Sequence, residues 1–107
     1  MKNQPIVVLI TAPSPETGEQ IANVLLDQKL AACVNIVPQV KSLYTWQGQT
    51  CTDTEALLIV KTHAGLLKER LIPAVQAIHP YEVPEIIALP ILGGLKSYLD
   101  WVDQSTE

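Results

Sequence analysis

The chain has 107 residues, of which 48% are hydrophobic and only 17% charged, and its formal net charge is −4. This length predicts a single domain over residues 1–107, with an apolar share that needs no metal or disulfide staple. The negative charge, the scattered lysines and the absence of phenylalanine exclude a nucleic-acid surface. Because ordinary domains carry about 25% charged residues, we also expect part of the surface to be covered by copies of the chain.

The N-terminal part predicts a strand followed by a helix. Residues 6–10 form an uninterrupted β-branched run, typical of a central strand that is buried on both faces. Ser14 before Pro15 is a helix start signal, and apolar residues at helical spacing predict a helix over 15–28. Residues 1–5 contain no export signal or membrane span, so we expect a cytoplasmic chain with no membrane partner.

A long hairpin is predicted next, with strands over 31–46 and 50–62 and a turn at Gly48. Pro38 cannot donate to a strand ladder, so it should mark a bulge, a bend or an edge. Both strands exceed the average length of about five or six residues. The tip should therefore reach a neighbouring subunit, where Tyr44 and Trp46 are the expected interface anchors.

The two cysteines, Cys33 and Cys51, fit no paired motif. A turn at Gly48 sets Cys33 near His63 and Cys51 near Thr45, which separates the thiols by roughly 40 Å along the ladder. A disulfide needs Cα atoms within about 7 Å, so we expect two free thiols in a reducing compartment. Cys33 lies among small apolar residues and is interpreted as a packing residue, with soft-metal binding as the alternative.

The second half predicts a helix over 64–79, which Pro73 should bend unless the helix starts late. A last strand over 86–92 follows, with its end at a sheet edge because of Pro90. A short helix over 95–104 closes the chain. The order β-α-β-β-α-β plus a C-terminal helix predicts an α+β, ferredoxin-like fold, with an antiparallel sheet and both helices on one face.

The connection over residues 79–85 is the segment richest in chemistry, with an imidazole, a phenol and two carboxylates among two prolines. His79 with Glu82 or Glu85 can bind a divalent metal or transfer protons, whereas the alternative is a rigid corner between helix and strand. The lone His63 is interpreted as flanking the second helix. Because no nucleophile–base pair is recognisable, a hydrolase or isomerase that uses His79 and Glu82 is the least favoured hypothesis.

Several stretches follow one another in a distinctive order: Thr11-Ala12-Pro13, residues 29–35, residues 42–48, Glu55, Lys61-Thr62, residues 79–86 and residues 98–101. In this combination, which spans almost the whole chain, they resemble the CutA family of divalent-cation tolerance proteins. The resemblance implies a ferredoxin-like subunit, a homotrimer built by strand pairing between subunits, a likeness to the trimeric PII signalling proteins and high thermal stability. It also implies a role in the response to divalent metal ions.

Copper-binding members of that family can carry a cysteine just before the Thr-Ala-Pro stretch and a second histidine just before His-Pro-Tyr. Ile10 and Ile78 occupy these positions in this chain. Only His79 remains of that ligand set, and a single imidazole without a nearby thiolate binds copper weakly. The resemblance therefore predicts weak or absent copper binding.

We expect a non-enzymatic, cytosolic homotrimer with no resident cofactor, which responds to metal ions or senses a small-molecule ligand as PII proteins do. The ligand cleft between subunits should be lined by His79, Tyr81, Glu82 and Glu85, with Lys61 and Cys33 as further candidates. The alternative is direct binding of a divalent metal such as copper by His79 and a carboxylate. The trimer interface should contain Tyr44, Trp46 and Trp101.

Overall fold

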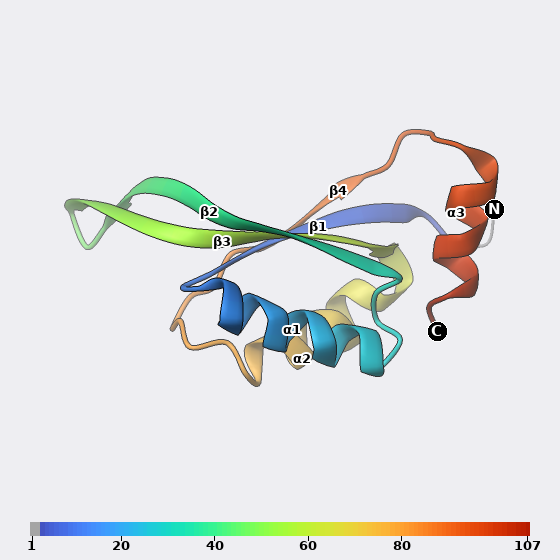
Figure 1. Ribbon diagram of the computed structural model, residues 1–107, viewed down its shortest axis with the longest axis horizontal. Helices are drawn as coiled ribbons and strands as arrows, with labels where there is room; N and C mark the ends of the chain where they lie inside the picture. Colours follow the sequence, from blue (N-terminus) through green and yellow to red (C-terminus); the bar gives the residue numbers. More distant parts are fainter. Residues whose placement is uncertain (1–2) are drawn as a thin grey trace.

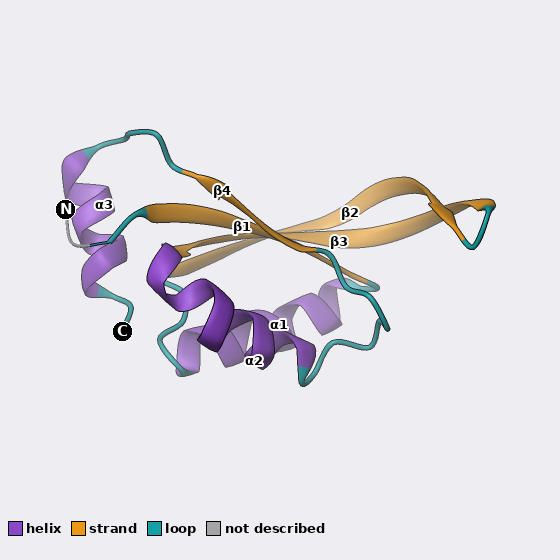
Figure 2. Cartoon of the chain, turned by 180° about the vertical axis from the view of Figure 1, so that it is seen from behind, coloured by secondary structure: helices purple, strands orange, loops and turns teal. Residues whose placement is uncertain are grey.

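In the computed structural model, which describes residues 3–107, a four-stranded antiparallel sheet carries two helices on one face (Figure 1, Figure 2). The strands are β1 (Pro5–Ala12), β2 (Cys33–Trp46), β3 (Gln49–His63) and β4 (Ile86–Pro90). Their order across the sheet is β2-β3-β1-β4. The helices on the sheet are α1 (Pro15–Asp27) and α2 (Ile72–Gln76), and α3 (Lys96–Gln104) lies at one end of it. The predicted ferredoxin-like order is confirmed.

The central strand β1 lies between β3 and β4, as its apolar run predicts. Ile6, Val8 and Ile10 are buried in the core that the helices complete, whereas Val7 and Leu9 are only partly buried. The expectation that this strand is buried on both faces is therefore wrong for the single chain. The reason is that α1 and α2 pack on the same side of the sheet (Figure 2).

The face of the sheet opposite the helices is apolar. Leu9 pairs with Ile59 of β3 and Ile87 of β4, and Val7 pairs with Leu89 of β4, so all five side chains share this face. Ile87 and Leu89 are each 51% exposed. We call this surface the open sheet face. Strand β4 is a sheet edge, as its proline predicts, but it ends at Pro90 instead of residue 92. Only Ile86 and Ala88 of this strand are partly buried, and its other residues are exposed.

The β2–β3 hairpin projects well beyond the two helices (Figure 1), and the chain measures 44 Å along its longest axis against 25 and 23 Å along the others. Its tip is a two-residue turn, in which Gln47 and Gly48 have φ angles of 52° and 76°. Positive φ at both positions is typical of the tight turns that match the twist of a hairpin. Trp46 and Gln49 pair directly beside this turn.

Pro38 lies at a β-bulge on the edge strand β2, where the pairing register shifts between Val37 and Val40. The bulge and the two-residue turn each move the pairing by one residue from the expected register. Cys33 therefore pairs with Lys61, two residues before the His63 near which it was expected. Cys51 pairs with Tyr44, far along the ladder, and both thiols are free, as predicted.

The first helix begins as the sequence predicts. Ser14 caps it, with its Oγ accepting a hydrogen bond from the backbone N–H of Thr17 at 3.2 Å, and Pro15 occupies the first turn. The helix ends at Asp27, close to the expected boundary. Among residues 3–107, no helix has both the length and the apolar character needed to cross a membrane.

The second helical segment is less regular than the expected helix over 64–79. It starts as a 3₁₀ turn at Ala64–Leu66, widens to a π-helix at Leu67–Leu71 and becomes α-helical only at Ile72–Gln76. Pro73 gives the physical reason, because its nitrogen has no hydrogen to donate to the carbonyl of Glu69. The preceding turn is wider as a result, and the α-helix proper starts late, which was the alternative to a bend at Pro73.

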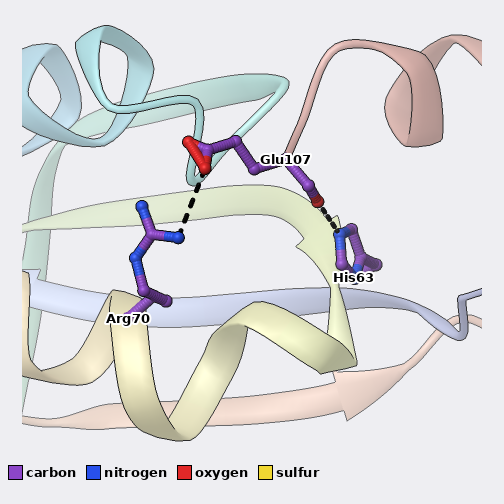
Figure 3. A network of polar contacts seen from close by, with 3 residues as sticks. All are labelled: His63, Arg70 and Glu107. Atoms are coloured by element: carbon purple, nitrogen blue, oxygen red, sulfur yellow. Dashed lines mark hydrogen bonds and ion pairs between the residues drawn. The ribbon is translucent and has the colours of Figure 1, made fainter.

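The end of the chain is fastened to the end of β3 (Figure 3). Nε2 of His63 lies 2.8 Å from the backbone oxygen of Glu107, and Arg70 forms an ion pair with the Glu107 carboxylate at 3.3 Å. The backbone N–H of Glu107 also donates to the carbonyl of Lys29 at 3.0 Å. His63 directly precedes the second helical segment, so the prediction that it flanks this helix is confirmed.

Candidate functional site

A groove of about 600 Å³ lies where the hairpin meets the 79–85 connection, and we call it the hairpin groove. It is lined by Thr11, Lys41, Ser42, Leu43, Tyr44, Trp46, Asp53, Glu55, Tyr81, Glu82, Val83 and Glu85. Three of the four principal cleft candidates, Tyr81, Glu82 and Glu85, are in this lining. The fourth, His79, is buried behind it, with 8% of its surface exposed.

His79 attaches the 79–85 connection to the end of β1. Its Nε2 lies 2.7 Å from the backbone oxygen of Thr11, and its Nδ1 lies 3.1 Å from the backbone nitrogen of Tyr81. A carbonyl oxygen can only accept and a backbone N–H can only donate. These partners therefore assign a neutral ring that carries its proton on Nε2.

Tyr81 extends this set of hydrogen bonds from His79 to β3. Its hydroxyl donates to Oε2 of Glu55 at 2.7 Å, and its ring packs against the imidazole of His79 with centroids 4.8 Å apart. Burial, and after it the hydrogen bond to Glu55, raise the pKa of the Tyr81 phenol far above its ordinary value. Glu55 is 7% exposed, so this carboxylate lies at the floor of the groove.

A second tyrosine–carboxylate pair lies on the hairpin itself. The hydroxyl of Tyr44 donates to Asp53, and this hydrogen bond is the main reason why the pKa of Tyr44 rises to about 12. Together with the two carboxylates of these pairs, Glu82 and Glu85 bring the groove lining to four carboxylates, against one lysine, Lys41. The lining therefore has an excess of negative charge, which favours a cationic ligand over a phosphate.

The other two cleft candidates, Lys61 and Cys33, do not reach the hairpin groove. They pair with each other across β2 and β3, and Lys61 lies about 20 Å along β3 from Glu55 at the usual strand rise. The ammonium of Lys61 donates to the side-chain oxygen of Asn35. The Cys33 thiol is near Tyr98, whose pKa is raised by burial and then by Cys33. The structure thus separates these two residues from the 79–85 connection.

The expected interface aromatics are partly exposed in the single chain. Tyr44, Trp46 and Trp101 are 40%, 42% and 44% exposed, respectively. Trp101 packs on Tyr98, with ring centroids 5.6 Å apart. Tyr44 and Trp46 also line the hairpin groove, so the expected interface and the candidate site share these side chains.

Sequence reasoning missed Asp53 as a groove residue, and it noted Thr11 and Glu55 only as part of the family resemblance. Asp53 and Glu55 are two residues apart in one strand, and this spacing places both carboxylates on the same face. That periodicity was a usable signal. The contact of Thr11 with His79 had no local signal, because 68 positions separate the two residues.

The donor set does not fit a resident copper ion bound through His79. Both ring nitrogens of His79 already have hydrogen-bond partners, so neither offers a free lone pair. In the part of the chain that the structure describes, no three His, Cys, Asp or Glu side chains converge to hold a metal ion. Metal binding at His79 would require the ring to give up Thr11 or Tyr81.

Comparison with known proteins identifies relatives over nearly the full length of the chain. The family model described as CutA1 divalent ion tolerance protein matches residues 6–105. The divalent-cation tolerance protein CutA of Thermus thermophilus is 55% identical over 103 residues, which cover 94% of this chain and 96% of the relative. The chloroplastic protein CutA of Arabidopsis thaliana is 52% identical over 101 residues, or 94% of this chain, but the match spans only 55% of that relative's length.

Solved structures agree with these sequence matches. The crystal structure of CutA1 from Oryza sativa has a TM-score of 0.93 at 50% identity, covering 98% of this chain and 95% of that one. The periplasmic divalent cation tolerance protein CutA from Archaeoglobus fulgidus has a TM-score of 0.92 at 46% identity, covering 96% and 99%. The predicted fold and the predicted resemblance are both confirmed. The chain belongs to the CutA1 divalent ion tolerance protein family.

Proposed function

We propose that the chain acts in divalent-cation tolerance as a homotrimer without catalytic activity, and that the hairpin groove lies at a subunit junction and selects cations. The observation that supports this most strongly is the charge of the groove, with four carboxylates against Lys41 alone. Carboxylates in a partly enclosed groove raise the local concentration of cations and repel anions. The family relationship supplies the link to divalent cations.

The open sheet face supports the trimer. Ile87 and Leu89, each half-exposed, lie beside Leu9 and Ile59 on a surface that the helices leave uncovered. An apolar surface of this kind on a small domain is typical of an interaction site. The long hairpin and the edge strand β4 also offer unpaired backbone groups, which a closed assembly would use.

Three alternatives remain, and the geometry disfavours each of them in part. A PII-like sensor would place its ligand in the same junction, but nucleotide phosphates would face the carboxylates of the groove. Direct copper binding through His79 and a carboxylate needs a ring nitrogen that is already hydrogen-bonded. An acid–base enzyme built on His79 and Glu82 meets the same obstacle.

A cytoplasmic location is part of the same proposal. Both cysteines, Cys33 and Cys51, are free, which suits a reducing compartment. Two relatives carry other locations in their names, chloroplastic for the Arabidopsis protein and periplasmic for the Archaeoglobus protein. Fractionation of the source cells, with detection of this chain, distinguishes the three compartments.

Calorimetric titration of the native protein with zinc, copper and ATP tests the selectivity of the groove. We expect the metals to bind with dissociation constants above about 1 µM and with strong salt dependence, because spread-out surface carboxylates give only screened attraction. ATP should give no binding heat. The double variant Glu82→Gln, Glu85→Gln should lose most of the metal heat.

The matched control changes two exposed carboxylates on α1, Glu16→Gln and Glu19→Gln, and should leave the metal heat unchanged. Stoichiometric binding of ATP would overturn the cation-selective groove in favour of a nucleotide sensor. Equal loss of heat in both double variants would show that the metals respond to overall charge and not to the groove.

A further inference from the structure

Three segments that are far apart in the sequence meet at His79. Its backbone N–H donates to the carbonyl of Val75 at 2.9 Å, which fixes the residue to the end of α2. Its ring then reaches Thr11 at the end of β1, and through Tyr81 it is linked to Glu55 of β3. The imidazole is therefore the joint between a helix, two strands and the connection that lines the hairpin groove.

We propose that His79 is a positioning residue, a neutral imidazole that sets the wall of the hairpin groove by holding Tyr81 against Glu55, and that it does not act as a metal ligand. The assignment rests on the two ring contacts together, because Thr11 can only accept and the Tyr81 N–H can only donate. Only the tautomer with its proton on Nε2 satisfies both partners. The tilted contact between the His79 and Tyr81 rings adds a third contact to the same side chain.

Metal binding and this joint exclude each other. A metal on Nδ1 must displace the Tyr81 N–H, and a metal on Nε2 must displace the carbonyl of Thr11. Either change leaves a polar backbone group near a buried side chain without its partner, which is costly. Occupation of His79 by a metal would therefore release the groove wall that Tyr81 forms.

Three substitutions separate the two ring contacts in the metal-free protein. His79→Asn keeps an acceptor near the position of Nδ1, His79→Gln keeps a donor near the position of Nε2, and His79→Ala removes both. Hydrogen exchange of the Tyr81 amide, followed by NMR, reports the first contact. In His79→Gln and His79→Ala this exchange should accelerate about tenfold or more, since one hydrogen bond corresponds to about one power of ten in an opening equilibrium.

In His79→Asn the Tyr81 amide should keep most of its protection, and this rescue is a result that a merely space-filling role would not produce. Exchange in His79→Asn as fast as in His79→Ala would overturn the proposal. The Tyr81 ring resonances should shift in His79→Ala toward those of Glu55→Gln, which cuts the same chain at its other end. No ligand is needed, so failure here is separate from failure of the cation-selective groove.

The native protein supplies a test that needs no variant. Nitrogen NMR of the imidazole should show the tautomer protonated on Nε2, and one equivalent of zinc should leave the His79 ring resonances in place. The opposite tautomer would overturn the assignment. So would a zinc-induced shift of a His79 ring nitrogen while the Tyr81 amide stays protected, because the ring would then hold both partners at once.

Discussion

Each of the three tyrosine hydroxyls is in a setting that opposes its ionisation. Tyr81 is shifted by burial and by Glu55, Tyr44 by its hydrogen bond to Asp53, and Tyr98 by burial. In all three cases the pKa is raised, because a phenolate would face either an apolar surrounding or a carboxylate. The two tyrosines of the hairpin groove therefore act as hydrogen-bond donors to its carboxylates, Asp53 and Glu55.

The alkaline stability of the protein should depend on these shifts. A raised pKa in the folded state means that the stabilising contribution is complete below the unfolded value of about 10 and is lost as the pH rises through the folded value. We expect the urea midpoint to fall above about pH 10 and phenolate absorbance to appear later than in urea-unfolded protein. Tyr81→Phe should flatten this fall more than Tyr98→Phe, and titration of all three phenols at the ordinary pKa would contradict it.

At this scale the sequence predicted the groove-lining roles of Tyr81, Glu82 and Glu85, because a proline-rich connection with clustered polar groups is a local signal. For His79 it left two interpretations open, a metal ligand or proton carrier and a part of a rigid corner between helix and strand. The choice between ligand and positioning residue depends on Thr11, which only the fold brings within 2.7 Å of the ring. Local residue types identify where chemistry is concentrated, but hydrogen-bond partners decide what each group can do.

Among the elements, the hairpin and the helical segments agree with the sequence-based predictions wherever a local residue determines the structure. Pro38 and Pro73 marked real irregularities, since a missing N–H acts at its own position. The register of the hairpin was not predictable in the same way. The register depends on a bulge and a turn that each shift the pairing by one residue. Neither shift changes the alternation of residue types enough to be recognised in the sequence.

The contacts that hold Glu107 against the end of β3 should stabilise the fold far more through His63 than through Arg70. His63 is 5% exposed, so His63→Leu removes a buried donor from the Glu107 oxygen, at a cost of about 1–3 kcal/mol in unfolding free energy. The side chains of the Arg70–Glu107 pair are 46% and 48% exposed, and Arg70→Gln should cost less than about 1 kcal/mol. Urea denaturation at neutral pH measures both.

His63→Gln is the control, because it keeps a donor near the position of Nε2 and should recover part of the loss. Salt separates the two contacts further, since only the exposed ion pair should weaken as ionic strength rises. Equal destabilisation by Arg70→Gln and His63→Leu would show that the ion pair, and not the buried ring, holds the end of the chain.

For the whole molecule, the order of strands and helices was predictable because each element has its own periodicity and the connection rules allow few arrangements. The burial of β1 on one face only was not predictable in this way. The run of residues 6–10 is apolar on both faces, yet the single chain covers only the face of Ile6, Val8 and Ile10. An apolar strand pattern that exceeds what its own chain can cover supports the proposed assembly.

The last prediction concerns the proposed trimer. Trp46 stands beside the turn of a hairpin that projects beyond the helices, and 42% of its surface is exposed in the single chain. If a neighbouring subunit covers it in a closed trimer, Trp46→Ala should weaken assembly by about 2 kcal/mol or more per site, as for other buried aromatic anchors. Sedimentation at micromolar concentration, together with the melting temperature, measures the effect.

Leu26→Ala on α1 is the matched control, because Leu26 has the same 42% exposure but lies on the helix layer, and this variant should leave the trimer intact. A native monomer, or a Trp46→Ala trimer with an unchanged melting temperature, would contradict the prediction that the hairpin tip lies in a trimer interface.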